Sequence, residues 1–335
     1  MSSVAVVRPE KLLKDLAAEW TQLGKAESEG SSRSAGVLRA VTMTMLVGVE
    51  AGEDERLALE ALSQLMHEHP ARAIILRLVA DDAEALSGRA YATCWMPFGR
   101  RSQICCEQIE LSAGANSFSE IPRLLRGLVA PDLPVVFWCR SAKVFAHSSY
   151  ETIAALADKV ILDSRAHPDP DATVRVIDAQ LRAGHLVGDI TWTRLTRWRQ
   201  TISAAFERAD CRAFFDSLSK VQILYTHQPE PIAARYLRAW LQSILGAKFP
   251  VVLTHSPDAE SCSWQIRQVS FISPSSNVVI ERPEKGMAEI HVADFHSRAL
   301  FESINEAELV RDEISILGRD PVFAKATHLL SLSHS

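Results

Sequence analysis

Hydrophobic positions follow two spacings along this chain, and segments of the two kinds alternate. Apolar residues that recur every three or four positions are typical of amphipathic helices, whereas short apolar runs and strict alternation are typical of strands. Helices are predicted at residues 9–23, 54–68, 119–128, 149–157, 173–183, 231–245, 306–317 and 321–332. Strands are predicted at residues 38–49, 73–79, 88–96, 102–111, 134–139, 160–163, 221–225, 250–253, 262–271, 277–281 and 288–292.

The order of these elements predicts the fold class. Strands and helices alternate between residues 38 and 163, which indicates a layered α/β domain. A predicted hairpin around a turn at residues 97–101 makes its sheet mixed. We therefore predict an α/β fold of two layered α/β domains with mixed sheets, an N-terminal helical arm and C-terminal helices. The predicted divisions are residues 1–36 for the helix and a flexible linker, 37–165 for the N-terminal domain and 166–335 for the C-terminal domain.

Residues 188–206 hold two tryptophans and three arginines within eight positions and predict a turn followed by a long helix. Asp189 or Thr191 is placed to accept hydrogen bonds from the first free backbone N–H groups, so either one is a candidate N-cap. Residues at spacings of three and four form an apolar stripe that we expect to face a core: Leu195, Trp198, Ile202, Ala205 and Phe206.

Two edges flank this stripe. Trp192, Thr196 and Arg199 line one edge at helical spacing. On the other edge Arg194 precedes Trp198 by one turn, where a guanidinium can stack on an indole face. One interpretation is a half-buried helix whose arginines lie along the indoles with their charged ends in water. The other is a contact surface for a partner, because tryptophan and arginine often anchor interfaces.

Composition restricts the function classes. The chain of 335 residues is 47% hydrophobic and 23% charged, which provides ample material for folded cores. Its formal net charge of −5 argues against general affinity for nucleic acid or anionic membranes, since both need a basic surface. No apolar run approaches the ~20 residues that cross a bilayer, and the N-terminal residues lack the features of a secretory signal. We therefore expect a cytoplasmic protein.

The motifs of nucleotide chemistry are missing from the sequence. The loop at residues 50–55 reads EAGEDE, without GxGxxG or a P-loop, and its acidic groups would repel a phosphate. This counts against both a P-loop enzyme and a dinucleotide-binding oxidoreductase. His67 and His69 are weak metal-ligand candidates, and we prefer their role as positive groups at a helix C-terminus. We predict no catalytic residues, no cofactor and no metal site.

Cysteine spacing suggests one candidate redox pair. Six cysteines in a chain of this length do not form a disulfide framework, and reduced thiols are the default for such a protein. Folding of the predicted hairpin brings Cys94 opposite Cys105, so a cross-strand linkage is one hypothesis. Cys106 follows Cys105 directly and is expected to point to the other face of the sheet.

Four segments resemble one known family, the OpcA glucose-6-phosphate dehydrogenase assembly proteins. They are HEHPARAIIL at residues 67–76, LVAPDLPVVFWCR at 128–140, DITWTRLTRWR at 189–199 and LRAWLQSIL at 237–245. The third is similar to the family's D-x-x-W-x-R-x-T-x-W-R signature. It matches at Asp189, Trp192, Arg194, Thr196, Trp198 and Arg199.

The resemblance implies a two-domain α/β protein of the oxidative pentose phosphate pathway with no catalysis of its own. It implies that the chain binds glucose-6-phosphate dehydrogenase and favours the active oligomer of that enzyme, as an allosteric activator. We predict the partner-binding residues to be Trp192, Arg194, Arg197 and Arg199. The alternative is an enzyme or sensor that binds a sugar phosphate or nucleotide in an interdomain cleft, where these arginines would hold the phosphate.

Overall fold

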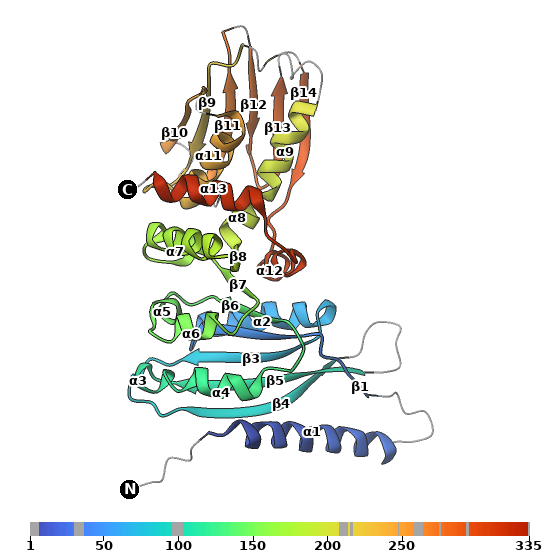
Figure 1. The fold of residues 1–335 in the computed structure, drawn as a ribbon. Helices are drawn as coiled ribbons and strands as arrows, with labels where there is room; N and C mark the ends of the chain where they lie inside the picture. Colours follow the sequence, from blue (N-terminus) through green and yellow to red (C-terminus); the bar gives the residue numbers. More distant parts are fainter. Residues whose placement is uncertain are drawn as a thin grey trace. The chain divides into compact units, whose positions relative to one another are not determined.

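The computed structural model describes residues 7–29, 37–95, 103–207, 214, 217–246, 248–257, 264–274, 276–292 and 295–333 (Figure 1). The chain divides into two compact units. The first comprises residues 1–166 and 185–188, and the second comprises residues 167–184 and 189–335. The division into residues 37–165 and 166–335 stays a prediction, and the contact-based units differ from it because residues 185–188 return to the first unit.

The first unit is built on an eight-stranded sheet. Its strands are β1 (Val37–Arg39), β2 (Met43–Glu50), β3 (Ala71–Leu78), β4 (Ser87–Trp95), β5 (Gln103–Ala113), β6 (Val135–Cys139), β7 (Lys159–Leu162) and β8 (Leu186–Asp189). They lie in the order β1-β5-β3-β2-β6-β7-β8, and β4 pairs with β5. The β4–β5 pair is antiparallel, whereas β5, β3, β2, β6 and β7 are parallel to one another. From β2 the chain builds outward to β3 and β5, then crosses to β6 and β7, which is the order of doubly wound dinucleotide-binding sheets.

Helices cover the apolar strands of this sheet. They are α1 (Pro9–Glu29), α2 (Glu53–Glu68), α3 (Ala115–Phe118), α4 (Ile121–Leu128), α5 (Ala142–Ala146) and α6 (Tyr150–Ala154). The central strands β2, β3 and β6 are buried along nearly their whole length, as expected for parallel strands with layers on both faces. On α2 the buried side chains are Ala58, Ala61, Leu62, Leu65 and Met66, which recur at helical spacing and form one apolar face.

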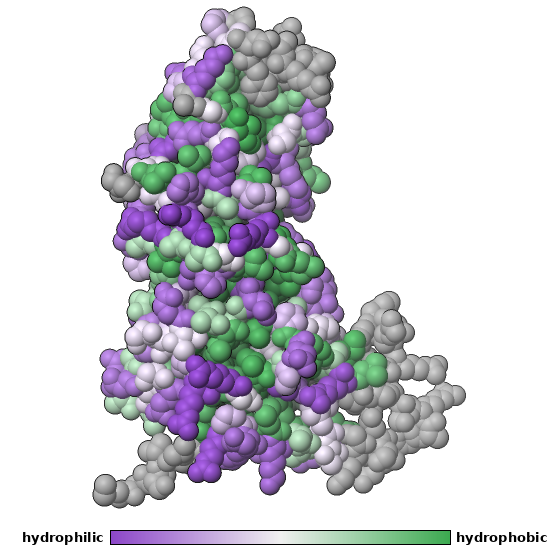
Figure 2. All heavy atoms as spheres, in the orientation of Figure 1, coloured by the Kyte–Doolittle hydropathy of each residue, from purple (hydrophilic) through white to green (hydrophobic). Residues whose placement is uncertain are grey.

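The N-terminal helix α1 packs on the first unit. Leu12 and Leu16 are buried, and the indole Nε1 of Trp20 donates to Oε1 of Glu107 on β5 at 3.3 Å. Hydrophilic residues predominate over α1 on the face that Figure 2 shows, as expected for an amphipathic helix with one side on a sheet. The helix continues to Glu29, so residues 24–29 of the predicted flexible linker are helical instead.

The second unit has a six-stranded mixed sheet in the order β10-β9-β11-β12-β13-β14. Its strands are β9 (Lys220–Tyr225), β10 (Val251–His255), β11 (Ile266–Ile272), β12 (Asn277–Glu281), β13 (Gly286–Val292) and β14 (Phe295–Phe301). Its helices are α7 (Pro170–Ala183), α8 (Ile190–Arg194), α9 (Thr196–Glu207), α11 (Ile232–Leu245), α12 (Glu306–Ser315) and α13 (Pro321–Leu332). Among the strand pairs of this second sheet in the described residues, only β9 and β10 are parallel. The predicted class, an α/β fold of two layered α/β domains with mixed sheets, is confirmed.

Several element boundaries differ from the sequence prediction. The strand expected at residues 38–49 is split into β1 and β2, which pair with different neighbours. The helix expected at residues 149–157 ends at Ala154, and α7 begins at Pro170 because Asp169 caps it and Pro170 fits its first turn. The pattern also missed β14, an edge strand in which exposed and half-buried positions prevail. The turn expected at residues 97–101 lies outside the described residues.

No helix in the part of the chain that the structure describes is both long enough and apolar enough to cross a membrane.

Candidate functional site

The carboxyl edge of the first sheet is the candidate ligand site that this fold defines. In doubly wound sheets ligands bind where the strand order reverses, which here is between β2 and β6. Side chains from both strand ends meet across that position. The hydroxyl of Ser141 donates to Oε1 of Glu50 at 3.0 Å, and Nζ of Lys143 lies 2.7 Å from Oε2 of the same carboxylate. Arg140 forms an ion pair with Asp54, so contacts within the chain occupy this edge.

The electrostatics of this edge disfavour a phosphate. A pyrophosphate in such folds lies at the N-terminus of the helix that follows the first strand, here α2. The chain turns into α2 through Gly52, whose φ of +108° suits glycine. The first turn of α2 then carries Glu53, Asp54 and Glu55. These carboxylates interact favourably with the helix dipole themselves and repel an incoming anion.

A cavity of about 360 Å³ lies beside this edge in the first unit. It is lined by Leu78, Val79, Ala80, Asp82, Ala115, Lys143, Ala146 and His147. Nδ1 of His147 accepts from the backbone N–H of Ser149 at 3.1 Å, and its Nε2 lies 3.0 Å from the carbonyl oxygen of Ala115. Both ring nitrogens of His147 are thus engaged within the chain, and Lys143 is paired with Glu50.

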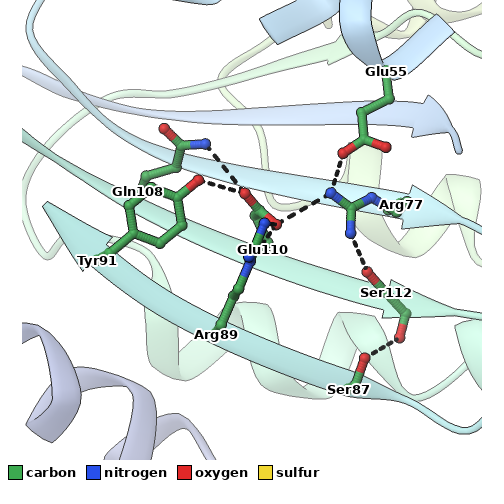
Figure 3. Close-up of polar contacts among 8 residues, drawn as sticks. All are labelled: Glu55, Arg77, Ser87, Arg89, Tyr91, Gln108, Glu110 and Ser112. Carbon is green, nitrogen blue, oxygen red and sulfur yellow. Dashed lines mark hydrogen bonds and ion pairs between the residues drawn. The ribbon is translucent and has the colours of Figure 1, made fainter. Parts of the chain in front are cut away.

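A network of charged residues centred on Glu110 lies on one face of β3, β4 and β5 (Figure 3). Arg89 Nε donates to Oε2 of Glu110 at 2.7 Å, Tyr91 donates to Oε1, and Arg77 Nη2 lies 3.1 Å from Oε2. Burial by itself would raise the pKa of the Glu110 carboxyl, but the hydrogen bonds from Tyr91 and Arg89 and the charge of Arg77 lower it. Arg77 also pairs with Glu55 of α2, so the network joins that helix to the sheet. Figure 3 shows these side chains converging from neighbouring strands, with Arg89 at the exposed end.

A second buried carboxylate, Glu107, lies on the opposite face of β5. Nε of Arg72 on β3 donates to its Oε2 at 2.6 Å, and Arg39 of β1 forms an ion pair with its Oε1. The guanidinium of Arg39 also lies over the ring of Trp20, 5.6 Å from its centroid. Glu107 thus connects two strands and α1. Sequence patterns did not single out either glutamate. For Glu110 a usable signal existed, because Arg89 lies opposite it in the predicted hairpin. For Glu107 the opposing arginine is on β3, a pairing that the sequence did not predict.

The candidate redox pair is a disulfide bond in the structure. Cys94 of β4 and Cys105 of β5 are directly opposite each other in the register, and their sulfur atoms are bonded. Cys106 and Cys139 are free and buried, and burial raises the pKa of both thiols, to about 11 for Cys106. A thiol with so high a pKa is almost entirely protonated at neutral pH and hence unreactive. Control of function by the Cys94–Cys105 bond stays a prediction.

We expect peptide mapping under non-reducing conditions to recover the Cys94–Cys105 linkage after mild oxidation. After denaturation, alkylation of Cys94 and Cys105 should require a thiol reductant, whereas Cys106 serves as an internal control and should be alkylated with or without it. The chain between the linked residues is short, so we expect reduction to destabilise the hairpin by about 3 kcal/mol in the loop-entropy model. Linkage through Cys106, or free thiols at Cys94 and Cys105 after oxidation, would contradict this assignment.

Three signature residues of the tryptophan-rich segment (residues 188–206) form part of the core of the second unit: Asp189, Trp192 and Trp198. Asp189 is fully buried, and its side chain accepts from the backbone N–H of Thr191, so Asp189 is the N-cap of α8. The predicted long helix consists of α8 and α9, separated by Leu195 alone. Leu195, Trp198, Ile202 and Ala205 of the predicted stripe are buried, as expected.

Trp192 lies inside this unit and not on its surface, since its exposed fraction is 2%. Its Nε1 donates to Oδ2 of Asp320 at 3.3 Å, and its ring contacts those of Tyr236 and Phe323. The guanidinium of Arg199 stacks 3.6 Å from its ring centroid. Burial lowers the pKa of Arg199 to about 10, against the opposing effect of nearby carboxylates.

The two remaining predicted partner residues are more accessible than Trp192. Arg194 is half-buried, and Arg197 is exposed on α9. The structure therefore brings Trp192 and Arg199 together as a packed pair and leaves Arg197 pointing to solvent. The partner role of all four residues stays a prediction, and Arg197 is the most exposed of the four.

Together these features define an α/β protein of two units. The sheet of the first unit is doubly wound, and ion pairs and hydrogen bonds within the chain occupy its carboxyl edge, where such sheets bind ligands. The model of the glucose-6-phosphate dehydrogenase subunit N-terminal domain matches residues 62–179, and that of the C-terminal domain matches residues 185–327. The two matches cover well over half of the chain. The chain belongs to the OpcA family of glucose-6-phosphate dehydrogenase subunits, which confirms the resemblance seen in the sequence.

Curated relatives agree with this family. The OxPP cycle protein OpcA of Nostoc punctiforme is 28% identical over 229 residues, which are 68% of this chain and 47% of that protein. The protein of the same name from Synechocystis is 24% identical over 229 residues, 68% of this chain and 46% of its own length. The chain thus spans about half the length of the curated relatives it matches.

Solved structures with a similar arrangement are more distant. Biliverdin reductase from Synechocystis has a TM-score of 0.45 at 8% identity, over 86% of this chain and 97% of that one. A variant of a 3-ketoreductase from Actinomadura kijaniata has a TM-score of 0.48 at 11% identity, over 86% and 95% of the two chains. Similarity at this level says nothing about activity.

Proposed function

We propose that this chain is a non-catalytic subunit that binds glucose-6-phosphate dehydrogenase and favours its active oligomer in the oxidative pentose phosphate cycle. Its main support is the family, because the matched domains bear the description of glucose-6-phosphate dehydrogenase subunits and the curated relatives bear an OxPP cycle name. An activator of this kind needs only a higher affinity for one state of its partner, since such binding shifts the population towards that state.

The carboxyl edge of the first sheet supports a binding role over catalysis. Chemistry with a dinucleotide needs room and positive potential at the strand reversal. Here Glu50 engages Ser141 and Lys143, Arg140 pairs with Asp54, and the following helix begins with three carboxylates. Opening this edge for a phosphate would expose those carboxylates to it, which is unfavourable.

We further propose that the surface where α8 ends and α9 begins contributes to the contact with the dehydrogenase. Arg197 is exposed and Arg194 is half-buried, whereas Trp192 and Arg199 hold the helix in place from inside. An arginine supported by a rigid helix is a common interface anchor because little conformational freedom remains to be lost on binding.

We expect mixing with the cognate dehydrogenase to raise its specific activity and to shift it to a larger species in size-exclusion chromatography with light scattering. Arg197→Glu should weaken this binding at least about 10-fold without changing the melting temperature, since reversing an interface charge costs of order 1.4 kcal/mol or more. Arg182→Glu, on the exposed last turn of α7, is the matched control and should bind as the unmodified chain does.

Thermal unfolding of the chain alone tests the alternative function. A ligand-binding sensor would show a higher melting temperature with glucose 6-phosphate or NADP in the absence of the dehydrogenase. The cavity beside Lys143 and His147 is where such a ligand would fit in the first unit. A clear ligand-induced rise together with no effect on the dehydrogenase would overturn the assembly role. If only Arg197→Glu has no effect, the contact surface is wrong and the function stands.

A further inference from the structure

A cluster of two histidines and two glutamates lies on one face of the second sheet. His291 of β13 pairs with His296 of β14, and Glu289 of β13 pairs with Glu281 of β12. Because side chains of a strand alternate between faces, Glu289 and His291 point to the same side as their cross-strand partners. Ala288 points to the other side and is completely buried. The register alone therefore gathers four potential metal ligands on the polar side of the sheet.

The ligand atoms of this cluster converge. Oε2 of Glu289 lies 3.6 Å from Nε2 of His291 and 3.5 Å from Nε2 of His296. Oε1 of Glu281 lies 3.4 Å from the same Nε2 of His291. The two imidazole rings are stacked, with centroids 4.5 Å apart and planes inclined by 15°, so they present the same edge to the carboxylates. One ligand atom from each of Glu289, His291 and His296 lies within 4.8 Å of the others.

These separations suit a shared ion better than direct hydrogen bonds. An N–H···O hydrogen bond normally spans about 2.7–3.2 Å. Two ligands bound tetrahedrally to a metal at about 2.0–2.1 Å are separated by about 3.4 Å. In addition, Nε2 of His291 is shielded from solvent by its neighbours and has no hydrogen-bond partner within the described part of the chain. A buried nitrogen without such a partner is unfavourable unless an ion or water fills the gap.

A fifth residue orients the shared carboxylate. Arg298 of β14 donates from Nε to Oε1 of Glu289 at 2.9 Å, and its Nη2 lies 2.8 Å from the same oxygen. This leaves Oε2 directed towards the imidazoles. A hydrogen bond that fixes a ligating carboxylate in this way is a usual feature of the outer shell of metal sites.

We propose that His291, His296 and Glu289, with Glu281 as a fourth ligand, bind a divalent first-row transition metal ion such as Zn2+. Imidazole nitrogens combined with carboxylate oxygens suit this class of ion, whereas Mg2+ and Ca2+ prefer oxygen ligands only. His296 is exposed, so the ion can enter directly from solvent. The site is independent of the proposed function, since it lies on the sheet and not on α9.

The test is calorimetric titration of the full chain with Zn2+, repeated with Co2+ and followed by visible absorption. We expect one ion per chain at this site and an absorption band typical of nitrogen and oxygen ligands. His291→Ala and Glu289→Gln should each weaken Zn2+ binding at least about 10- to 100-fold. His185→Ala, which removes an exposed histidine elsewhere, is the control and should keep the affinity of the unmodified chain.

Glu289→Gln keeps the size of the side chain, so it remains informative if an alanine variant fails to fold. Circular dichroism in EDTA establishes that each variant is folded before titration. The proposal is overturned if the unmodified chain binds no Zn2+, or if both cluster variants bind as tightly as it does. A Co2+ spectrum with thiolate charge-transfer bands would place the ion at cysteines and would also overturn it.

Discussion

Replacing Glu107 with glutamine is expected to lower the free energy of unfolding of the first unit by about 3–5 kcal/mol. The carboxylate is 1% exposed and lies between Arg72 and Arg39. Glutamine occupies nearly the same space but carries no charge. It therefore leaves the guanidinium of Arg72, which is itself buried, without its opposing charge in a region of low dielectric.

The measurement is urea denaturation, with hydrogen exchange of the β3 and β5 amides to assign the loss to the first unit. Glu60→Gln is the matched control, because Glu60 pairs with Arg56 on the exposed side of α2. An exposed pair of this kind contributes about 0.5 kcal/mol or less. Equal, small losses in the two variants would show that the buried carboxylate is not required for stability.

Replacing Trp192 with alanine is expected to lower the free energy of unfolding of the second unit by about 3–5 kcal/mol. The indole packs against Tyr236 and Phe323, with ring centroids 6.0 and 5.5 Å away, and supports the guanidinium of Arg199. Its removal leaves a cavity and also the half-buried charge of Arg199 without the aromatic face on which it stacks.

Thermal and urea unfolding measure this effect, and Arg197→Ala on the exposed side of α9 is the comparison, with an expected change within about 0.5 kcal/mol. The result also separates the two interpretations of the tryptophan-rich segment. A Trp192→Ala variant with unchanged stability and lost binding to the dehydrogenase would favour the interface, and it would contradict the packing described above.

Local patterns were sufficient for much of the fold. Residues 54–68 and 321–332 combine a helical apolar stripe with strong end signals, and they correspond to α2 and α13 within one residue. Asp320 caps α13 by accepting from two backbone N–H groups, and Pro321 occupies the first turn, both of which are common signals of a helix start. Such signals act between neighbouring residues, which is why they can be read without a tertiary structure.

The tryptophan-rich segment shows what helical spacing alone cannot predict. Helical spacing correctly placed Trp192 and Arg199 on one edge of the apolar stripe. It could not show that Asp320, 128 residues further along the chain, meets the indole nitrogen and closes that edge. The residue types of a buried packed pair and of an interface anchor are the same, so burial has to be known from the fold.

By itself the sequence determined the α/β class, the positions of most helices and strands and the family, and it offered the linkage of Cys94 with Cys105 as a hypothesis. These depend on spacing, capping and hairpin register over short stretches of chain. The tertiary structure alone decided that Trp192 is buried and that Glu107 and Glu110 are centres of charged networks. It also decided that the side-chain ligand atoms of His291, His296 and Glu289 lie close together. The burial of Trp192 depends on the packing of α11 and α13, and the other features depend on strand order and register, because only the folded chain brings these partners within a few ångströms.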